Sequence, residues 1–346
     1  MKIHYKNASK EACEIQKIFE PNFPMWLVEY IETPEMQKQA RISMTCGTIY
    51  SDLFPESVFY SSLDHSVGVA LIVWHFTHDK KQTLAGLFHD IATPAFKHCV
   101  DFMNGDYMTQ ESTEELTTEM IKGSKSIMKL LRRDGIEVSE VDDYHKYPIA
   151  DNDTPQLSAD RLEYSLSNSL FEINQSTIER TKYFYDDLEV QTNSDGEPEL
   201  GFKTKKCARD FVKATSKMSV FYRDDSKRYS MQLVADILKN LSEDGKISVR
   251  DLYELSEAEV IKIIEDSKYR NAFEIWKNAK EVKTSSVKPS GVYYVHHGAK
   301  VRYIDPLVKG ERISKICKIA KKYIDKNLAY DMSNYVYLDG IKADLL

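Results

Sequence analysis

The sequence is poor in glycine, proline and cysteine, and it has no long apolar run. Its 346 residues include only 13 Gly and 10 Pro, which excludes collagen-like and low-complexity chains. The 5 cysteines lie far apart and form no CxxC pair, so neither a disulfide framework nor a zinc ribbon is indicated. The most apolar run, residues 67–74, is too short to span a bilayer. These absences predict no membrane insertion and a cytoplasmic location.

An excess of positive charge is also missing. The chain carries 47 Lys+Arg against 54 Asp+Glu, a formal net charge of −7. Nucleic-acid affinity comes largely from neutralised phosphates, so the composition gives no strong nucleic-acid signal. A local basic pocket for a small anion remains compatible with it. The hydrophobic share of 42% suffices for a buried core and excludes wholesale disorder.

Helical periodicity dominates the chain, which predicts a mainly α-helical fold. Residues 64–76 are apolar around most of a helix circumference, so we expect this helix to be central. Further helices are expected at residues 80–89, 94–102, 159–171, 205–222, 226–241, 258–265 and 311–327, and one that Thr109 caps and that runs through Ile121. Residues 193–196 read as a hairpin tip, and the β-rich segments 292–295 and 301–304 flank a turn.

The change from helical periodicity to β-rich segments along the sequence suggests that the chain has three parts. We expect a helical domain over residues 34–275 and a smaller C-terminal α/β lobe over 276–346. Residues 1–33 form an N-terminal segment whose Trp26, Leu27 and Ile31 could pack on a neighbouring chain. A homo-oligomer is therefore one hypothesis.

Side chains that bind metals or transfer protons gather in four places. Imidazole nitrogen and carboxylate oxygen together suit a divalent cation, and two His with two Asp leave positions for water and substrate. Adjacent residues in a helix point about 100° apart, so His89 and Asp90 can converge only where a helix ends, as the following Ala92-Thr93-Pro94 run allows. The four places are His65, the pair His89–Asp90, the trio His98, Asp101 and Glu111, and Asp160.

Four of the 9 histidines have a simpler interpretation. A histidine beside an apolar helix is more often a hydrogen-bonded core residue than a ligand, and we assign His4, His75, His78 and His145 to that class. The pair His89–Asp90 differs, because the sequence places no cationic neighbour beside a carboxylate that would be buried. Burying it unpaired is costly, and a metal removes that cost.

Three motifs carry a resemblance to a known family. They are SSLDHSVGV at residues 61–69, LAGLFHDI at 84–91 and ADRLEY at 159–164. Together they resemble the H…HD…D signature of the HD-domain metal-dependent phosphohydrolases, which implies an HD-type helical domain. The most similar subgroup is the deoxynucleoside triphosphate (dNTP) triphosphohydrolases, including the one joined to a sterile-alpha-motif domain. The likeness touches most of residues 40–315 and is strong at 61–101 and around 160.

The resemblance implies a role for each candidate residue. A divalent metal, one of Mn, Fe, Zn, Ni or Mg, is expected on His65, His89, Asp90 and Asp160. The catalytic group comprises His98 on the phosphate side of the site, Asp101 beside it, and Glu111, which matches the Glu of a His-Glu pair. Arg161 and Tyr164 match positions that face the nucleotide, and Lys97 and Arg41 are the other basic side chains expected near the metal.

The sequence departs from this subgroup at positions that matter for the triphosphate. Ser62 stands where the triphosphohydrolases carry an arginine that grips the phosphates, and Gln110 stands where they carry the catalytic histidine. Thr93 replaces another active-site histidine. We therefore expect nucleoside mono- or diphosphates, or another small phosphoester, to be handled at least as well as dNTPs.

The leading hypothesis is a metal-dependent phosphohydrolase that cleaves a nucleotide or related phosphoester through attack by a metal-activated water. His98 is the expected general acid or electrostatic stabiliser. One alternative is a nucleotide-binding regulatory protein with reduced or no catalysis. Another is a di-iron oxygenase on the same scaffold, which would need further ligands such as His98 or Glu111. A purely structural helical module explains none of the clustering.

Overall fold

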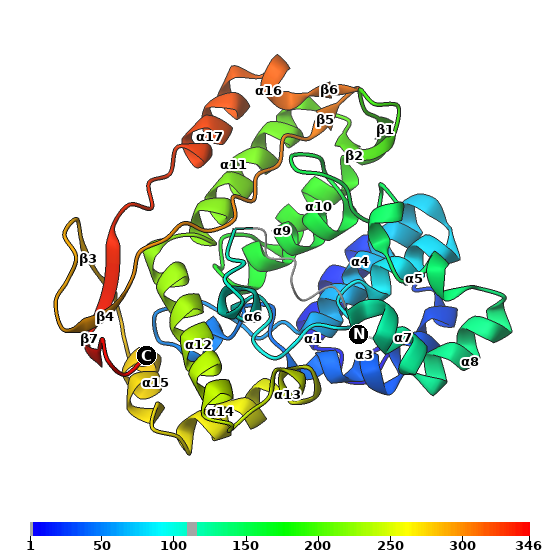
Figure 1. Cartoon of the computed structure of the whole chain (residues 1–346). Helices are drawn as coiled ribbons and strands as arrows, with labels where there is room; N and C mark the ends of the chain where they lie inside the picture. Colours follow the sequence, from blue (N-terminus) through cyan, green and yellow to red (C-terminus); the bar gives the residue numbers. More distant parts are fainter. Residues whose placement is uncertain (1–2, 109–115) are drawn as a thin grey trace.

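The chain folds into a mainly helical structure, as the sequence predicted. The computed structural model describes residues 3–108 and 116–346, and Figure 1 shows the arrangement of their elements. The helices are α1 (Lys10–Phe19), α2 (Val28–Ile31), α3 (Pro34–Lys38), α4 (Ser62–Thr77), α5 (Lys80–Phe88), α6 (Cys99–Met103), α7 (Thr117–Gly123), α8 (Lys125–Asp134), α9 (Ala159–Phe171), α10 (Ile178–Asp186), α11 (Lys205–Phe221), α12 (Asp225–Glu243), α13 (Val249–Glu254), α14 (Glu257–Glu265), α15 (Arg270–Lys277), α16 (Ile313–Ile316) and α17 (Lys318–Leu328). The strands are β1 (Leu188–Thr192), β2 (Pro198–Phe202), β3 (Lys283–Ser285), β4 (Val292–Val295), β5 (Leu307–Val308), β6 (Glu311–Arg312) and β7 (Tyr335–Lys342).

Helix α4 is the central element, which confirms the prediction for residues 64–76. Every residue from Ser62 to Val73 is buried, and α1, α5 and α9 pack around the helix. The Ser61 hydroxyl caps its first turn by accepting a hydrogen bond from the Asp64 amide at 3.0 Å. Gly68 permits the close approach of α9, because a Cβ at this position would lie 2.8 Å from the Cγ atom of Glu163.

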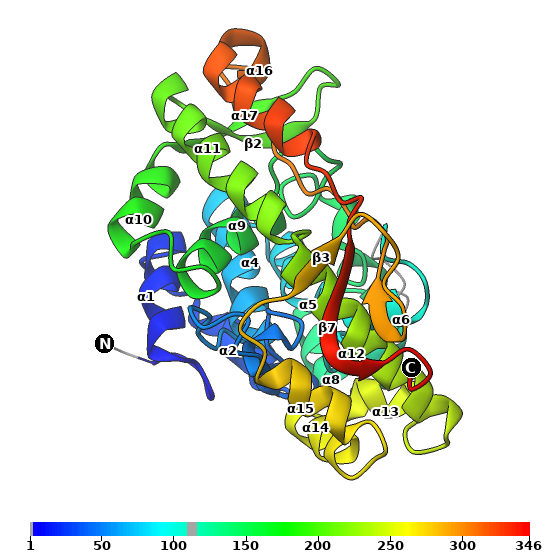
Figure 2. The same ribbon diagram turned by 90° about the vertical axis from the view of Figure 1, so that its left-hand side faces the viewer.

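The N-terminal segment packs on α4 of the same chain. Leu27 and Ile31 are fully buried in the core around α4, and the ring centroids of Trp26 and Trp74 lie 5.4 Å apart. The Tyr5 hydroxyl donates a hydrogen bond to the Asp64 carboxylate at 2.8 Å. Figure 2 shows α1 alongside α4 and α10. For Leu27 and Ile31 the hypothesis of packing on a neighbouring chain is therefore wrong, because their partners lie within this chain. Trp26 is partly exposed, and a homo-oligomer stays a prediction.

The strands form two small sheets. One has the order β1-β2-β5-β6 and begins with the predicted hairpin around residues 193–196. The other has the order β3-β7-β4, and in it β4 pairs antiparallel with β7. The strand expected at residues 301–304 does not form, because β7 supplies the partner of β4. Residues 301–304 instead run without regular structure and bury Ile304 in the core around α4.

Two other expected helices differ from the structure. The helix expected at residues 94–102 begins only at Cys99, because Phe96 and Lys97 have φ angles of 65° and 44° in the left-handed region. The helix expected at 311–327 begins with β6 and is divided into α16 and α17 at Cys317, whose backbone is extended. Thr109, the expected cap of another helix, lies outside the described residues.

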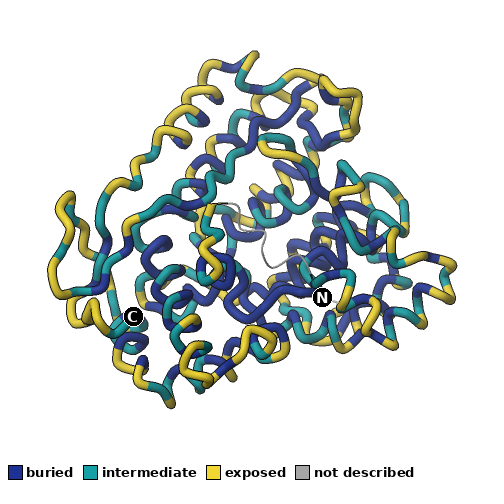
Figure 3. The backbone as a smooth tube through the Cα atoms, in the orientation of Figure 1, coloured by how far each residue is buried: buried dark blue, intermediate teal, exposed yellow. Residues whose placement is uncertain are grey.

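The buried apolar residues form two hydrophobic cores, and the chain passes from one to the other between residues 92 and 95. The first surrounds α4, α5, α9 and α11, and the second surrounds α6, α12, α15 and β7. In Figure 3 the buried stretches, coloured dark blue, lie mainly toward the inside of the molecule. Ala92 belongs to the first core and Ala95 to the second, so the segment after His89–Asp90 crosses from one core to the other. The division at residue 276 stays a prediction, since the C-terminal part contributes Ile324 to the first core and Val336 to the second.

No helix among the described residues is both long enough and apolar enough to cross a membrane.

The central position of α4 gives a stability prediction. We expect Leu71→Ala to lower the free energy of unfolding by about 2–5 kcal/mol, because Leu71 is fully buried and its removal leaves a cavity. Val249→Ala, at a side chain that is 44% exposed, should change it by less than about 0.5 kcal/mol. Urea unfolding measures both, and equal values for the two variants would contradict the central role of α4.

A buried carboxyl group at the start of α14 predicts a pH dependence of stability. Burial raises the pKa of Glu257 from 4.5 to about 7, although the Tyr50 hydroxyl donates a hydrogen bond to it. Between these two values the folded state holds a proton that the unfolded state has released. The contribution of Glu257 to stability is therefore complete below pH 4.5 and is lost as the pH rises to about 7. Melting temperatures across this range should fall less steeply in Glu257→Gln than in the wild type or in the exposed control Glu243→Gln.

Candidate metal centre

Four side chains from three elements converge at the junction of α4, α5 and α9. The Nε2 atoms of His65 on α4 and His89 at the end of α5 lie 3.1 Å apart. Oδ1 of Asp160, in the first turn of α9, lies 3.2 Å from Nε2 of His65 and 3.7 Å from Nε2 of His89. Oδ2 of Asp90 lies 3.9 and 3.8 Å from the same two nitrogens. His65, His89 and Asp160 offer ligand atoms within 4.8 Å of one another, a spacing that fits a metal ion.

The other nitrogen of each imidazole is fixed from behind. Nδ1 of His65 contacts the Glu163 carboxylate, and Nδ1 of His89 lies 2.7 Å from the Gly86 carbonyl oxygen. Both acceptors require a proton on Nδ1, so Nε2 is the nitrogen of each neutral imidazole that can offer a lone pair to the centre. This outer hydrogen bonding is typical of metal-binding histidines.

Glu163 is the site residue that the sequence analysis missed. It is fully buried, and it accepts hydrogen bonds from the Tyr60 hydroxyl at 2.7 Å and the Ser167 hydroxyl at 3.2 Å. The signal was present in the ADRLEY motif, because a residue three positions after Asp160 lies on the same face of a helix. In that motif the resemblance implied a site role for the neighbouring Tyr164 and none for Glu163.

Asp90 has a cationic partner, which corrects the argument made from the sequence. The buried Lys97 ammonium lies 2.5 Å from Oδ2 of Asp90 and donates to the Ser62 hydroxyl at 3.2 Å. Burial opposes ionisation of Asp90, but Lys97 and the two imidazoles hold the pKa of this carboxyl well below its usual value. The left-handed backbone at Phe96 and Lys97 turns this lysine back toward the site. Lys97 thus places a cation beside Ser62, where the triphosphohydrolases carry an arginine.

The site retains an excess of negative charge. Asp90, Asp160 and Glu163 bring three carboxylates, whereas Lys97 is the one ammonium paired with them among residues 3–108 and 116–346. Burial lowers the pKa of His65, but Glu163 and Asp160 outweigh it and raise that pKa to about 10. The protein therefore favours a positive charge between these carboxylates. A divalent cation supplies one, so the donor set and its charge fit a metal ion.

A pocket of about 620 Å³ opens from the metal-binding residues. His98 lines it, and Nδ1 of His98 lies 2.8 Å from the fully buried carboxylate of Asp101. Burial lowers the pKa of His98, and the charges of Arg302 and Lys97 lower it further against the opposing effect of Asp101. Together these effects favour the neutral imidazole of His98. Glu111, the third predicted catalytic residue, lies outside the described residues, as does Gln110.

The predicted substrate-binding residues have different positions. Lys97, Arg161 and Tyr164 line the pocket. Arg161 is turned toward the loop before α9, with a nitrogen 2.6 Å from the side-chain oxygen of Asn152. Arg41 is absent from the pocket lining, and its half-exposed guanidinium lies 3.6 Å from Glu259.

Two further cations line the pocket, and so does His145, which the sequence analysis wrongly assigned to the core. Lys300 and Arg302 come from the irregular segment after β4, and the Arg302 guanidinium lies 5.9 Å from the ring centroid of Tyr164. His145 also lines the pocket, with Nε2 3.5 Å from the Asp151 carboxylate. Local sequence gave no signal for these residues, because their segments reach the pocket only through the tertiary fold.

Comparison with known proteins adds distant relatives. No protein-family model matches the chain. An uncharacterized protein of Bacillus subtilis, YdhJ, is 25% identical over 247 residues, which cover 71% of this chain and 73% of that protein. The metal-dependent phosphohydrolase cns2 of Cordyceps militaris is 22% identical over 313 residues, covering 83% of this chain and 81% of cns2.

Two crystal structures have a similar fold. A phosphohydrolase from Bacteroides thetaiotaomicron superposes with a TM-score of 0.61 at 13% identity, covering 91% of this chain and 95% of its own. A hypothetical protein from Aquifex aeolicus also has a TM-score of 0.61, at 15% identity and with 91% and 92% coverage. At these identities the two structures show a similar fold. The triphosphohydrolase subgroup stays a prediction.

The contact behind His65 predicts how metal affinity is set. We expect Glu163→Gln to weaken divalent-metal binding by about 10–100-fold, because it removes the carboxylate that orients and polarises His65. Metal titration of the purified variant, followed by elemental analysis, measures the loss. Glu197→Gln, in the exposed hairpin, is the charge-matched control. Unchanged affinity in Glu163→Gln would mean that His65 does not hold the metal.

Proposed function

We propose that the protein is an HD-type metal-dependent phosphohydrolase that acts on a nucleotide or related phosphoester. The convergence of His65, His89, Asp90 and Asp160 beside a pocket lined by cations supports this proposal most strongly. The name of cns2 is consistent with it. These four residues would hold a divalent metal, which would supply Lewis-acid chemistry at a phosphoryl oxygen and at the attacking water.

His98 is suited to accept a proton or a hydrogen bond. Its Nδ1–H points to the Asp101 carboxylate, so Nε2 carries a lone pair while the imidazole is neutral. A histidine held in this way orients or deprotonates a water. The arrangement favours this role over the general acid expected from the sequence. In this scheme Asp101 keeps His98 in the required tautomer.

The cations of the pocket are the proposed phosphate ligands. Lys97 lies next to the metal-binding Asp90, and Arg302 lies over Tyr164, so the two approach the pocket from different segments. Charge-assisted bonds from lysine and arginine are the usual means of holding a phosphate. With the Arg302 guanidinium over its ring, Tyr164 orients that cation in addition to any contact with a base. The volume of about 620 Å³ lies within the range of pockets for nucleotide-sized ligands.

The oxygenase alternative has less support. A di-iron centre needs ligands beyond the four, and among residues 3–108 and 116–346 a single group of metal-binding side chains is found. His98, one of the extra ligands considered, does not belong to that group. A regulatory protein would bind a nucleotide at the same site without hydrolysing it. The next experiment therefore measures nucleotide hydrolysis.

Loss of one metal ligand tests the proposed reaction. We expect phosphate release from nucleotides to require a divalent metal and to fall by about two orders of magnitude or more in Asp160→Asn, because a metal contact is lost. Asp195→Asn, in the exposed hairpin, is the matched control. Release that persists unchanged in Asp160→Asn would point to a contaminating phosphatase. A nucleotide that raises the melting temperature of the wild type without turnover would identify a regulatory protein.

A second prediction concerns the number of phosphates. We expect nucleoside mono- or diphosphates to be cleaved at least as well as dNTPs, because Ser62 replaces the arginine that grips the triphosphate in the similar subgroup. Parallel assays of kcat/KM on the three classes measure this preference. Efficient release of tripolyphosphate from dNTPs with far lower activity on monophosphates would contradict it. Lys97 and Arg302 would then be the residues that supply the grip.

A further inference from the structure

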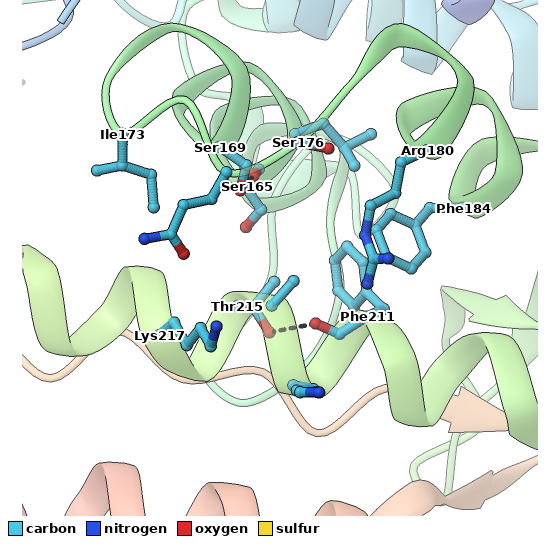
Figure 4. Close-up of a pocket in the computed structure, with 13 residues that line it drawn as sticks. Ser165, Ser169, Ile173, Ser176, Arg180, Phe184, Phe211, Thr215 and Lys217 are labelled. Atoms are coloured by element: carbon cyan, nitrogen blue, oxygen red, sulfur yellow. Dashed lines mark hydrogen bonds between the residues drawn. The ribbon is translucent and has the colours of Figure 1, made fainter. Parts of the chain in front are cut away.

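A second cavity lies on the opposite side of α9 from the metal centre. Its volume is about 230 Å³, and residues of α9, α10, α11 and the loop between α9 and α10 line it (Figure 4). It opens to the surface, where its basic residues Arg180, Lys213 and Lys217 are exposed. Asp160 and Tyr164 of α9 face the metal pocket, whereas Ser165 and Ser169 of the same helix line this cavity. The volume is below the roughly 300–1,000 Å³ of pockets for drug-sized ligands, so the cavity suits a small ligand.

The lining of this cavity is positively charged. It includes Arg180 from α10 and Lys213 and Lys217 from α11, and it contains no Asp or Glu. Within the part of the chain that the structure describes, none of these three cations forms an ion pair. The Arg180 guanidinium instead lies 5.0 Å from the centroid of the Phe184 ring. Positive charges gathered without acidic partners, in a chain of net charge −7, favour an anionic ligand.

A buried hydroxyl group points into the same space. Ser165 is 4% exposed, and Figure 4 shows its side chain directed into the cavity. Among the described residues its hydroxyl has no hydrogen-bond partner. The neighbouring Ser169 hydroxyl, by contrast, donates to the Ser165 carbonyl oxygen at 2.7 Å. Because the Ser165 hydroxyl faces the cavity, it can donate a hydrogen bond to a ligand bound there.

We propose that this cavity binds a small phosphorylated anion, held by Arg180, Lys217 and the Ser165 hydroxyl. Phosphate accepts several charge-assisted hydrogen bonds at once, which a guanidinium, an ammonium and a hydroxyl can donate. The apolar walls at Ile173 and Phe184 leave room for a small organic group attached to the phosphate. The site is independent of the metal centre and of the proposed reaction.

Lysine footprinting of the wild-type protein tests the location of binding. Inorganic phosphate is the probe, and potassium chloride at equal ionic strength is the control. We expect saturating phosphate to reduce acetylation of Lys217 by about tenfold, because an ammonium paired with phosphate is shielded from the reagent. Lys206, exposed on the same helix and absent from the cavity lining, should be unaffected. Equal protection of the two lysines, or equal protection by chloride, would overturn the proposal.

Charge-matched variants test the affinity. Calorimetric titration of phosphate into Arg180→Ala/Lys217→Ala should show at least about tenfold weaker binding at this site, and Ser165→Ala about tenfold weaker binding. The control Lys182→Ala/Lys206→Ala removes the same charge from the same two helices and should bind as the wild type does. Unchanged affinity in both test variants would overturn the proposal. Because the footprint uses the wild type, a variant that fails to fold does not weaken the test.

Discussion

The buried negative charge around His65 and His89 is the constraint on which the rest of the structure depends. Asp90, Asp160 and Glu163 meet these imidazoles in a space where most of the side chains are shielded from water. Such a group is stable only when positive charge and hydrogen-bond donors are supplied around it. Lys97 provides part of that charge, the Tyr60 and Ser167 hydroxyls bond Glu163, and a divalent cation would complete the balance.

The position of the site at the meeting of two cores explains how that charge is supplied. The chain leaves the first core at Ala92 and enters the second at Ala95. Between α5 and α6 it cannot continue as a helix, and the left-handed residues Phe96 and Lys97 turn the lysine toward Asp90. One short connection thus carries a metal ligand, its cationic partner and the pocket histidine His98. This density of function in a connecting segment is common in enzymes, because a rigid scaffold on both sides fixes the segment.

Helix α9 has a different function on each face. The face toward α4 presents Asp160 and Glu163 to the histidines, and the close contact with α4 depends on Gly68. The opposite face presents Ser165 to the positively charged cavity between α10 and α11. At about 100° per residue, Ser165 points about a quarter to a half turn away from Asp160 and Glu163. The two sites therefore use different faces of α9.

The sequence by itself determined the helical class, the central helix α4 and the four side chains that converge on one point. The helical class and α4 follow from apolar periodicity and capping residues. The four side chains follow from the resemblance of three short motifs to the HD-domain phosphohydrolases. The sequence could not reveal Lys97 as the partner of Asp90, because proline and apolar neighbours suggested a continuous helix there. Glu163 lay within a recognised motif but was identified only by its contact with His65. Arg302, the N-terminal packing and the pairing of β4 with β7 were decided by the tertiary structure alone, since each joins segments that are far apart in the chain and no local pattern encodes such a contact.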